Sequence, residues 1–296
     1  MFDLISSSTA IDLSRLPPPS FLAPLSFAGI RAELVADLQA RLPEFDATVA
    51  SDPAVKLLEV FAYRELLLRQ AFNERALQTM LAYATGADLD NLGALVNVGR
   101  LLLADADGAT PATYESDADL RRRIQLAPES FSVAGPATAY RFHALSADAT
   151  IADAQATSPE PGEVLVTILS RLGDGTASPS QIAAVEAVVN AREVRPLTDL
   201  VTVASVELIP FTVFAELTLF QGPDAIVVLA AAEARLASFI ADARKIGRPV
   251  TRSGIIAALH VEGVLNVALA EPATDISPDG TQIAHCTGTD VTLADG

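Results

Sequence analysis

The pattern of apolar and polar positions from Asp52 to about Tyr83, DPAVKLLEVFAYRELLLRQAFNERALQTMLAY, predicts one long helix. Ser51 or Asp52 can cap its first turn, and Pro53 suits the first helical position, where the missing N–H costs nothing. After Pro53 the segment contains no Gly or Pro. Its apolar side chains form two rows, one of Leu57, Phe61, Leu68, Phe72 and Ala76, and one that begins with Val55, Leu58, Ala62 and Leu66. A stripe this wide indicates that the helix is covered on more than one side.

The same helix carries too many charges to cross a membrane, which requires about 20 mostly apolar residues. These charges are Lys56, Glu59, Arg64, Glu65, Arg69, Glu74 and Arg75. No later window of the sequence is long and uncharged enough to span a membrane. Two interpretations therefore stay open: the central helix of an ordinary domain, or a helix that joins a bundle shared with other chains.

The sequence around the long helix predicts an all-helical domain over residues 27–104. Residues 1–26 are rich in Ser and Pro and are expected to form an extended arm. Short helices are expected over residues 27–42 and 88–96, before and after the long helix. Residues 101–111, rich in Ala and Asp, are expected to be a linker, which places a domain boundary there.

The pattern changes to mixed helices and strands over residues 112–208, the first α+β module. The predicted order is helix, helix, strand, strand, helix, strand, at residues 120–126, 137–147, 151–158, 164–170, 178–191 and 200–208. This order is typical of a small α+β sandwich with helices on one face of a sheet. The short turn between the first two strands implies antiparallel neighbours, whereas strand order elsewhere cannot be deduced.

Residues 209–296 form a second predicted α+β module. A strand, a helix opened by Pro223, a short helix capped by Thr251 or Ser253, a strand and a last strand or hairpin are expected at residues 211–220, 223–244, 251–260, 264–270 and 283–293. The predicted fold class is thus multidomain α+β, with an N-terminal helical domain that contains one long helix, followed by two small α+β sandwich modules.

Composition narrows the class of protein. Half of the 296 residues are hydrophobic, which excludes a disordered chain. The single cysteine, Cys286, excludes an internal disulfide framework, and the N-terminus lacks a signal-peptide pattern, so a soluble cytoplasmic product is expected. A net charge of −17 repels nucleic acid. The basic run Arg121–Arg123 follows the acidic residues Glu115, Asp117 and Asp119, and is expected to form salt bridges within or between subunits.

Candidate catalytic and metal-binding residues are absent from the sequence pattern. His143, His260 and His285 lie far apart, and none belongs to a CxxC or HxxxH pair, so no metal site is predicted. Asp105 and Asp107 resemble the start of a calcium loop, but Gly108 comes too early. No phosphate-binding glycine motif or GxSxG elbow is present, so no cofactor and no catalytic residue is assigned.

Several blocks, in order, resemble the baseplate J-like wedge proteins of contractile phage tails and tail-derived (R-type) bacteriocins. The blocks are DPAVKLLEVFAYRELLLRQAFNERALQTMLAYATGADLDNLGALVNVGR, ESDADLRRRI, SVAGPATAYRFHALSA, VRPLTDLVTV, IGRPVTRSGIIAALHVEGVLNV and EPATDI. The resemblance extends from about Phe27 to about Ile276. It implies a structural, non-enzymatic subunit of a tail baseplate, assembled in the host bacterial cytoplasm.

The resemblance also implies partners. Two copies of such a chain would combine with one copy of a different, smaller wedge protein, and their N-terminal helices would pack in a shared bundle. Six such wedges would surround a central hub and spike, and the α+β modules would link neighbouring wedges into a ring that relays the contraction trigger to the sheath. Neither nucleic acid nor membrane insertion is expected.

The residues expected to contact partners in the bundle are Leu57, Phe61, Leu68 and Phe72, with Arg64, Glu65 and Arg69 as inter-chain charge partners. Hinges are expected at Ala104–Pro111 and near Ile209–Pro210. Two alternatives remain. One is a baseplate subunit of another contractile injection system, such as a type VI secretion or toxin-delivery particle. The other, from a different class, is a small enzyme acting on cell-wall glycans.

Overall fold

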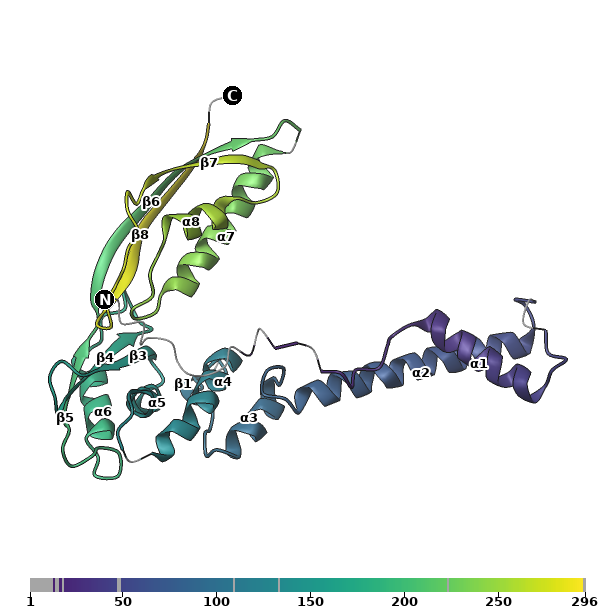
Figure 1. The fold of residues 1–296 in the computed structure, drawn as a ribbon, viewed down its shortest axis with the longest axis horizontal. Coiled ribbons are helices and arrows are strands. Elements are labelled where there is room, and N and C mark those ends of the chain that lie inside the picture. The colour runs from purple at the N-terminus through teal and green to yellow at the C-terminus, as the bar shows by residue number, and fades with distance from the viewer. Residues whose placement is uncertain are drawn as a thin grey trace. The chain divides into compact units, whose positions relative to one another are not determined.

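The computed structural model describes residues 13, 16–17, 19–46, 49–108, 110–132, 134–222 and 224–294. The chain divides into a unit of residues 11–99 and a unit that contains residues 100–296 (Figure 1). The structure confirms a mixed α+β architecture with a helical N-terminal region. Much of the predicted arm over residues 1–26 lies outside the described residues.

The N-terminal unit contains α1 (Phe27–Arg41), α2 (Pro53–Gln78) and α3 (Gly86–Ala94). The Asp52 side chain caps α2 by accepting a hydrogen bond from the backbone N–H of Ala54, as the sequence predicts. The predicted extension of this helix to Tyr83 is wrong, because α2 ends at Gln78. There the Gln78 side chain accepts a hydrogen bond from the backbone N–H of Thr85, and this local bond competes with further helical turns.

Helix α1 lies along α2 and covers one of its faces (Figure 1). Ile30 of α1 and Val55 and Ala62 of α2 are buried, because apolar side chains of the two helices face each other. The segment before α1 is also attached to α2. The Asn73 side chain accepts a hydrogen bond from the backbone N–H of Ala23 and donates one to the carbonyl of the same residue.

The first α+β module begins with a small hairpin and continues into a sheet covered by helices (Figure 1). Its elements are β1 (Leu102–Ala104), β2 (Thr113–Tyr114), α4 (Asp117–Leu126), the 3₁₀ helix η2 (Ala127–Phe131), α5 (Ala137–Ala147), β3 (Ile151–Thr157), β4 (Glu163–Ser170), α6 (Pro179–Val189) and β5 (Leu200–Ser205). The sheet has the order β3-β4-β5, in which β3 is antiparallel and β5 parallel to β4. The predicted antiparallel hairpin is therefore confirmed.

The core of this module lies between the sheet and helices α5 and α6. Tyr140 and Ala144 of α5 pack in one buried cluster with Val185 of α6 and with Val166 and Ile168 of β4. The N-terminus of α6 is fixed by a capping box in which the side chains of Ser178 and Gln181 each accept a hydrogen bond from the other residue's backbone N–H.

The second α+β module has the sheet order β7-β6-β8. Its elements are β6 (Glu207–Leu219), α7 (Ala225–Ala243), α8 (Arg252–Leu259), β7 (Val264–Glu271) and β8 (Gln282–Leu293). Strand β6 is antiparallel to β7 and parallel to β8. Alternate residues of β6, including Val213 and Leu217, are buried against the helices, whereas Phe214 and Glu216 are exposed on the other face. Helix α7 begins after the cap Asp224. The Pro223 predicted to open it lies outside the described residues.

Neither predicted hinge is a free linker. Ile209 and Pro210 lie inside β6, paired with β8, so this prediction is wrong. Strand β7 pairs only with residues 214–219 of β6, which leaves an unpaired side at Pro210 where a missing N–H is tolerated. The other expected hinge, Ala104–Pro111, falls in the hairpin of β1 and β2.

The base of the β1–β2 hairpin is closed by hydrogen bonds on both sides. The backbone N–H of Glu115 donates to the Leu101 carbonyl, and the backbone N–H of Leu101 donates to the Glu115 carboxylate, each at 2.9 Å. Because these hydrogen bonds hold the two ends of the loop together, rotation within the loop leaves the segments before and after it in place. Such rotation therefore cannot turn one unit relative to the other. The boundary between the units lies instead at Gly99–Arg100.

A buried carboxylate joins the two α+β modules. Asp153 of β3 is 2% exposed, and its Oδ1 accepts hydrogen bonds from Arg122 at 2.5 Å and from Arg141 at 3.0 Å. Its Oδ2 accepts a hydrogen bond at 3.2 Å from the backbone N–H of Ile246, which follows α7 in the second module. Around this bond lies a buried apolar cluster of Leu169, Val206, Ile246 and Ile283, which again combines residues of both modules.

Candidate assembly surface

The face of α2 that α1 does not cover is apolar and exposed. Leu57, Phe61, Leu68 and Phe72 are 58%, 58%, 70% and 57% exposed, and their spacing of four, seven and four residues places them on one side of the helix. We call this set, together with Arg64 at its centre, the α2 stripe. Exposed apolar side chains that line up on one helix face are typical of a surface that binds another protein.

The two apolar rows of α2 thus have different environments. The row that includes Val55, Leu58 and Ala62 is buried within the N-terminal unit, and the row of the α2 stripe is exposed. The hydrophobic pattern predicted that two sides of the helix are covered. It could not show which row packs within the unit and which row is left for a partner. It also missed Val60 and Leu67, which are 55% and 40% exposed and extend the apolar surface to one side of the stripe.

Two of the three charged residues expected to reach a partner are instead paired within the chain. Arg69 donates hydrogen bonds to Glu65 at 2.5 Å and to Glu33 of α1 at 3.2 Å. The hydrogen bond with Glu65 raises the pKa of Arg69, so Arg69 keeps its positive charge in this pair. Arg64 differs, since it is exposed and has no hydrogen bond or ion pair within the part of the chain that the structure describes.

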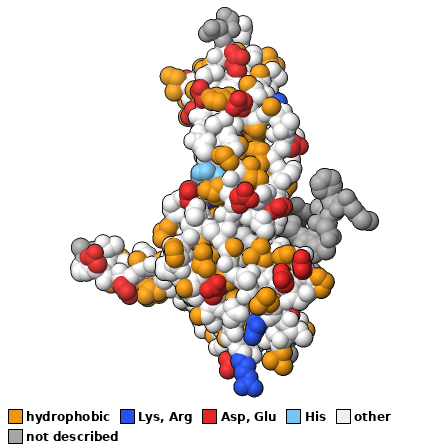
Figure 2. All heavy atoms as spheres, turned by 90° about the vertical axis from the view of Figure 1, so that its left-hand side faces the viewer, with side chains coloured by type: hydrophobic (Ala, Val, Ile, Leu, Met, Phe, Trp, Pro, Cys, Tyr) orange, Lys and Arg blue, Asp and Glu red, His pale blue; other side chains and the backbone are white. Residues whose placement is uncertain are grey.

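The basic run is also paired internally. Arg122 donates to Asp153, and the buried Arg123 forms an ion pair with the buried Glu115. Arg121 donates to the Asp117 carbonyl at 3.5 Å. Salt bridges within the subunit, one of the two predicted roles, therefore account for Arg122 and Arg123. Figure 2 shows red acidic side chains and few blue basic ones on the face that it presents, in keeping with the net charge of −17.

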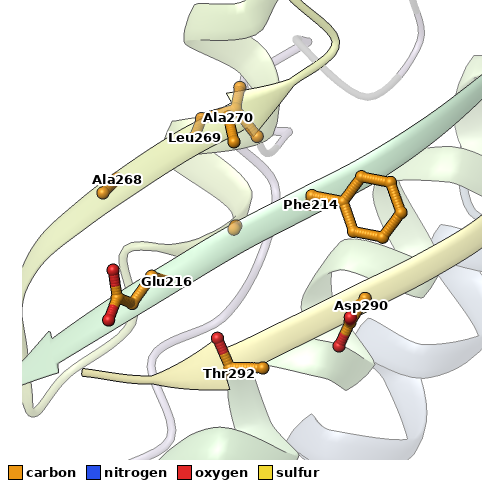
Figure 3. Close-up of a pocket in the computed structure, with 8 residues that line it drawn as sticks. Phe214, Glu216, Ala268, Leu269, Ala270, Asp290 and Thr292 are labelled. Carbon is orange, nitrogen blue, oxygen red and sulfur yellow. The ribbon is translucent and has the colours of Figure 1, made fainter. Parts of the chain in front are cut away.

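The open face of the second module's sheet contains a shallow hollow of about 360 Å³. Figure 3 shows Phe214 and Glu216 on β6 next to Asp290 and Thr292 on β8, with Ala268 and Ala270 along β7. Register pairs Phe214 with Asp290 and Glu216 with Thr292. The lining contains two carboxylates and one hydroxyl, that of Thr292, but no histidine, cysteine or serine.

A second groove, of about 730 Å³, lies between α7 and β8 and includes His285 and Cys286. Burial raises the pKa of the Cys286 thiol, which keeps it protonated and poorly reactive at neutral pH. His143 lies elsewhere, at the edge of the Phe142 ring, and burial lowers its pKa. Among the described residues, no three His, Cys, Asp or Glu side chains lie together as metal ligands.

None of the helices in the described ranges is long and apolar enough to cross a membrane. A chain that keeps an apolar helix face exposed, while its buried charges are paired internally, has the features of a structural assembly subunit. Three family models match the sequence in order: the Baseplate J-like N-terminal domain at residues 50–107, the Baseplate J-like central domain at 132–205, and the Baseplate J-like protein C-terminal domain at 211–294.

The sequence is also 44% identical over 288 residues to "Baseplate protein J" of Escherichia phage P2, an alignment that covers 94% of this chain and 95% of that protein. The chain therefore belongs to the Baseplate J-like family, which confirms the resemblance seen in its sequence blocks. The α2 stripe lies within the part matched by the N-terminal domain model.

Among solved structures, the chain is similar to one in the cryo-EM structure of the anti-feeding prophage baseplate, with six-fold symmetry applied. The two are 14% identical with a TM-score of 0.41, and the alignment covers 62% of this chain and 47% of the other. The chain thus spans about half of that relative's length.

Proposed function

We propose that this chain is a structural subunit of the baseplate of a contractile tail, in a phage or a tail-derived bacteriocin particle. The exposed α2 stripe carries the proposal, because its apolar side chains need a cover that the described residues of the N-terminal unit do not supply. The 44% identity to Baseplate protein J of phage P2 supports a baseplate as the assembly that supplies this cover. The proposal requires no catalytic residue and no cofactor.

In the finer form of the proposal, two copies of the chain and one smaller wedge protein form a wedge. The helical domain predicted over residues 27–104 supplies the shared bundle, in which Leu57, Phe61, Leu68 and Phe72 are buried. The modules predicted over residues 112–208 and 209–296 link six wedges into a ring around the hub and spike. Assembly takes place in the host cytoplasm, and contraction follows when rigid-body shifts at these interfaces reach the sheath.

The substitution Phe61→Asp tests the α2 stripe. Phe61 is 58% exposed in the chain alone, so we expect the variant to fold with a free energy of unfolding within about 0.5 kcal/mol of the parent. In the assembled wedge the new carboxylate would be buried without a partner, which costs about 3–5 kcal/mol. We therefore expect at least about a hundredfold fewer assembled particles, counted by electron microscopy after expression with the remaining tail proteins.

Gln70→Asp is the matched control, since Gln70 is exposed on α2 about 180° away from Phe61 and outside the stripe. This variant introduces the same carboxylate on the same helix and is expected to assemble normally. If Phe61→Asp also gave a normal number of contractile particles, the stripe would not be an interface and the proposed function of α2 would be wrong.

A further inference from the structure

One positive charge interrupts the α2 stripe at its centre. Arg64 follows Leu57 by seven residues and precedes Leu68 by four, so at 100° per residue it points to the same side of the helix. Its side chain is exposed, and no hydrogen bond or ion pair holds it within the described part of the chain. A partner that buries the stripe must therefore also bury this guanidinium or pair with it.

The carboxylates of α2 are already engaged elsewhere. Glu59 pairs with Lys56 at 2.9 Å and with Arg31 of α1 at 3.6 Å. Glu65 accepts two hydrogen bonds from Arg69, and Glu74 accepts one from Gln70. The exposed face of α2 is thus apolar with a net positive charge, although the whole chain carries −17.

A second copy of this helix is a poor match for such a face. A copy packed in register, or antiparallel about the middle of the stripe, would place one Arg64 against the other, and like charges at an interface cost several kcal/mol. A copy shifted along the axis offers no carboxylate to Arg64 either, because none of the stripe residues is acidic. Burying an unpaired guanidinium is similarly unfavourable.

We propose that the α2 stripe binds a helix of a different chain. That helix would pack apolar side chains against Leu57, Phe61, Leu68 and Phe72 and place a carboxylate opposite Arg64. This inference rests on the proposed function of the stripe and adds the chemistry of its partner. Arginine suits the role because its planar guanidinium forms paired hydrogen bonds with one carboxylate. The charge then selects the partner, and the apolar side chains supply most of the affinity.

The experiment uses this chain itself as the acidic probe. Sedimentation of the purified full chain, of its Arg64→Glu variant and of an equimolar mixture gives three association constants. We expect the mixture to associate at least about tenfold more tightly than either chain alone, because only the mixture places a guanidinium opposite a carboxylate. Arg64→Leu, which removes the charge, should strengthen self-association about tenfold relative to the parent.

Arg235→Glu is the control, because it makes the same charge change at an exposed position of α7 outside the stripe. Its mixture with the parent should associate no more tightly than the parent alone. The inference is overturned if the Arg64→Glu mixture is no tighter than the parent while Phe61→Asp weakens association. If Phe61→Asp leaves both association and particle assembly unchanged, the proposed function of the stripe fails as well.

Discussion

Asp153 is a residue whose side chain bridges the two α+β modules. Its carboxylate accepts hydrogen bonds from Arg122 and Arg141 in its own module and from the backbone N–H of Ile246 in the other. Burial acts to raise the pKa of Asp153, but the charges of Arg122 and Arg141 outweigh it and hold this pKa below its ordinary value. The carboxylate is therefore ionised wherever the protein is folded near neutral pH.

We expect Asp153→Asn to destabilise the protein by about 2–4 kcal/mol at pH 7, because it leaves the two partly buried guanidinium groups of Arg122 and Arg141 without their counter-charge. The measurement is the free energy of unfolding in urea. Asp290→Asn, at an exposed position on the open sheet face, is the control and should change stability by less than about 0.5 kcal/mol. Equal stability of the parent and Asp153→Asn at pH 7 would contradict this account of the junction.

The stability difference between the parent and Asp153→Asn should also depend on pH, in a direction set by the lowered pKa of Asp153. A carboxyl whose pKa is lower in the folded state stabilises that state above its unfolded pKa of about 4, and this contribution disappears as the pH falls through the folded pKa. The stability difference between the parent and Asp153→Asn should therefore be complete at pH 5 and become smaller below about pH 4. A difference that grew on acidification would show that Asp153 is protonated in the folded protein.

At the level of elements, local pattern predicted helices and hairpins better than long-range pairing. Asp52, Pro53 and the apolar rows located α2 correctly because caps and helical periodicity act over a few residues. The parallel pairs of β4 with β5 and of β6 with β8 could not be deduced, since each joins strands separated by at least one intervening helix. The wrong hinge in β6 has the same origin, because Pro210 indicates a break until the distant strand β8 is known to pair with it.

Helix α8 offers a test of close packing between elements. Replacing Gly by Ala inside a helix usually stabilises it by up to about 1 kcal/mol. At Gly254, however, an added Cβ would lie 2.9 Å from the Phe239 ring of α7. We expect Gly254→Ala to lower the free energy of unfolding by about 1–3 kcal/mol, as measured by urea denaturation.

Gly29→Ala on α1 is the comparison for this prediction. Its added Cβ would meet only the Ser26 side chain, at 3.3 Å, in an exposed position. This variant should be neutral or slightly more stable than the parent. Stabilisation by both substitutions would mean that α7 and α8 have room to separate.

For the whole molecule, the boundary between the two compact units lies at neither of the hinges that the sequence suggested. Both α+β modules belong to one compact unit joined by Asp153 and the cluster around Ile246, and the unit boundary lies at Gly99–Arg100. Asn97, just before this boundary, has a positive φ of 57°, which only a short polar residue or glycine readily adopts. We infer that rotation between the two units takes place over residues 97–100.

If two copies occupy different positions in each wedge, residues 100–294 should superpose as one rigid body and residues 19–99 as another, with the angular difference at residues 97–100. Superposition of every copy in a particle reconstruction measures this directly. Identical whole-chain conformations would remove the model of two environments. Rotation between residues 100–205 and residues 207–294 would show instead that the Asp153 junction opens.

The closed base of the β1–β2 hairpin makes its tip the place where the chain can be lengthened with least effect. Asp107 and Thr110 pair through backbone hydrogen bonds of 3.0 and 2.8 Å, and the hydrogen bonds between Leu101 and Glu115 hold the base whatever the tip contains. Closing a longer loop costs little, about 0.6 kcal/mol for each doubling of its length. A short epitope or a fluorescent tag inserted after Gly108 would therefore label every copy in an assembled particle without disturbing the fold of either unit.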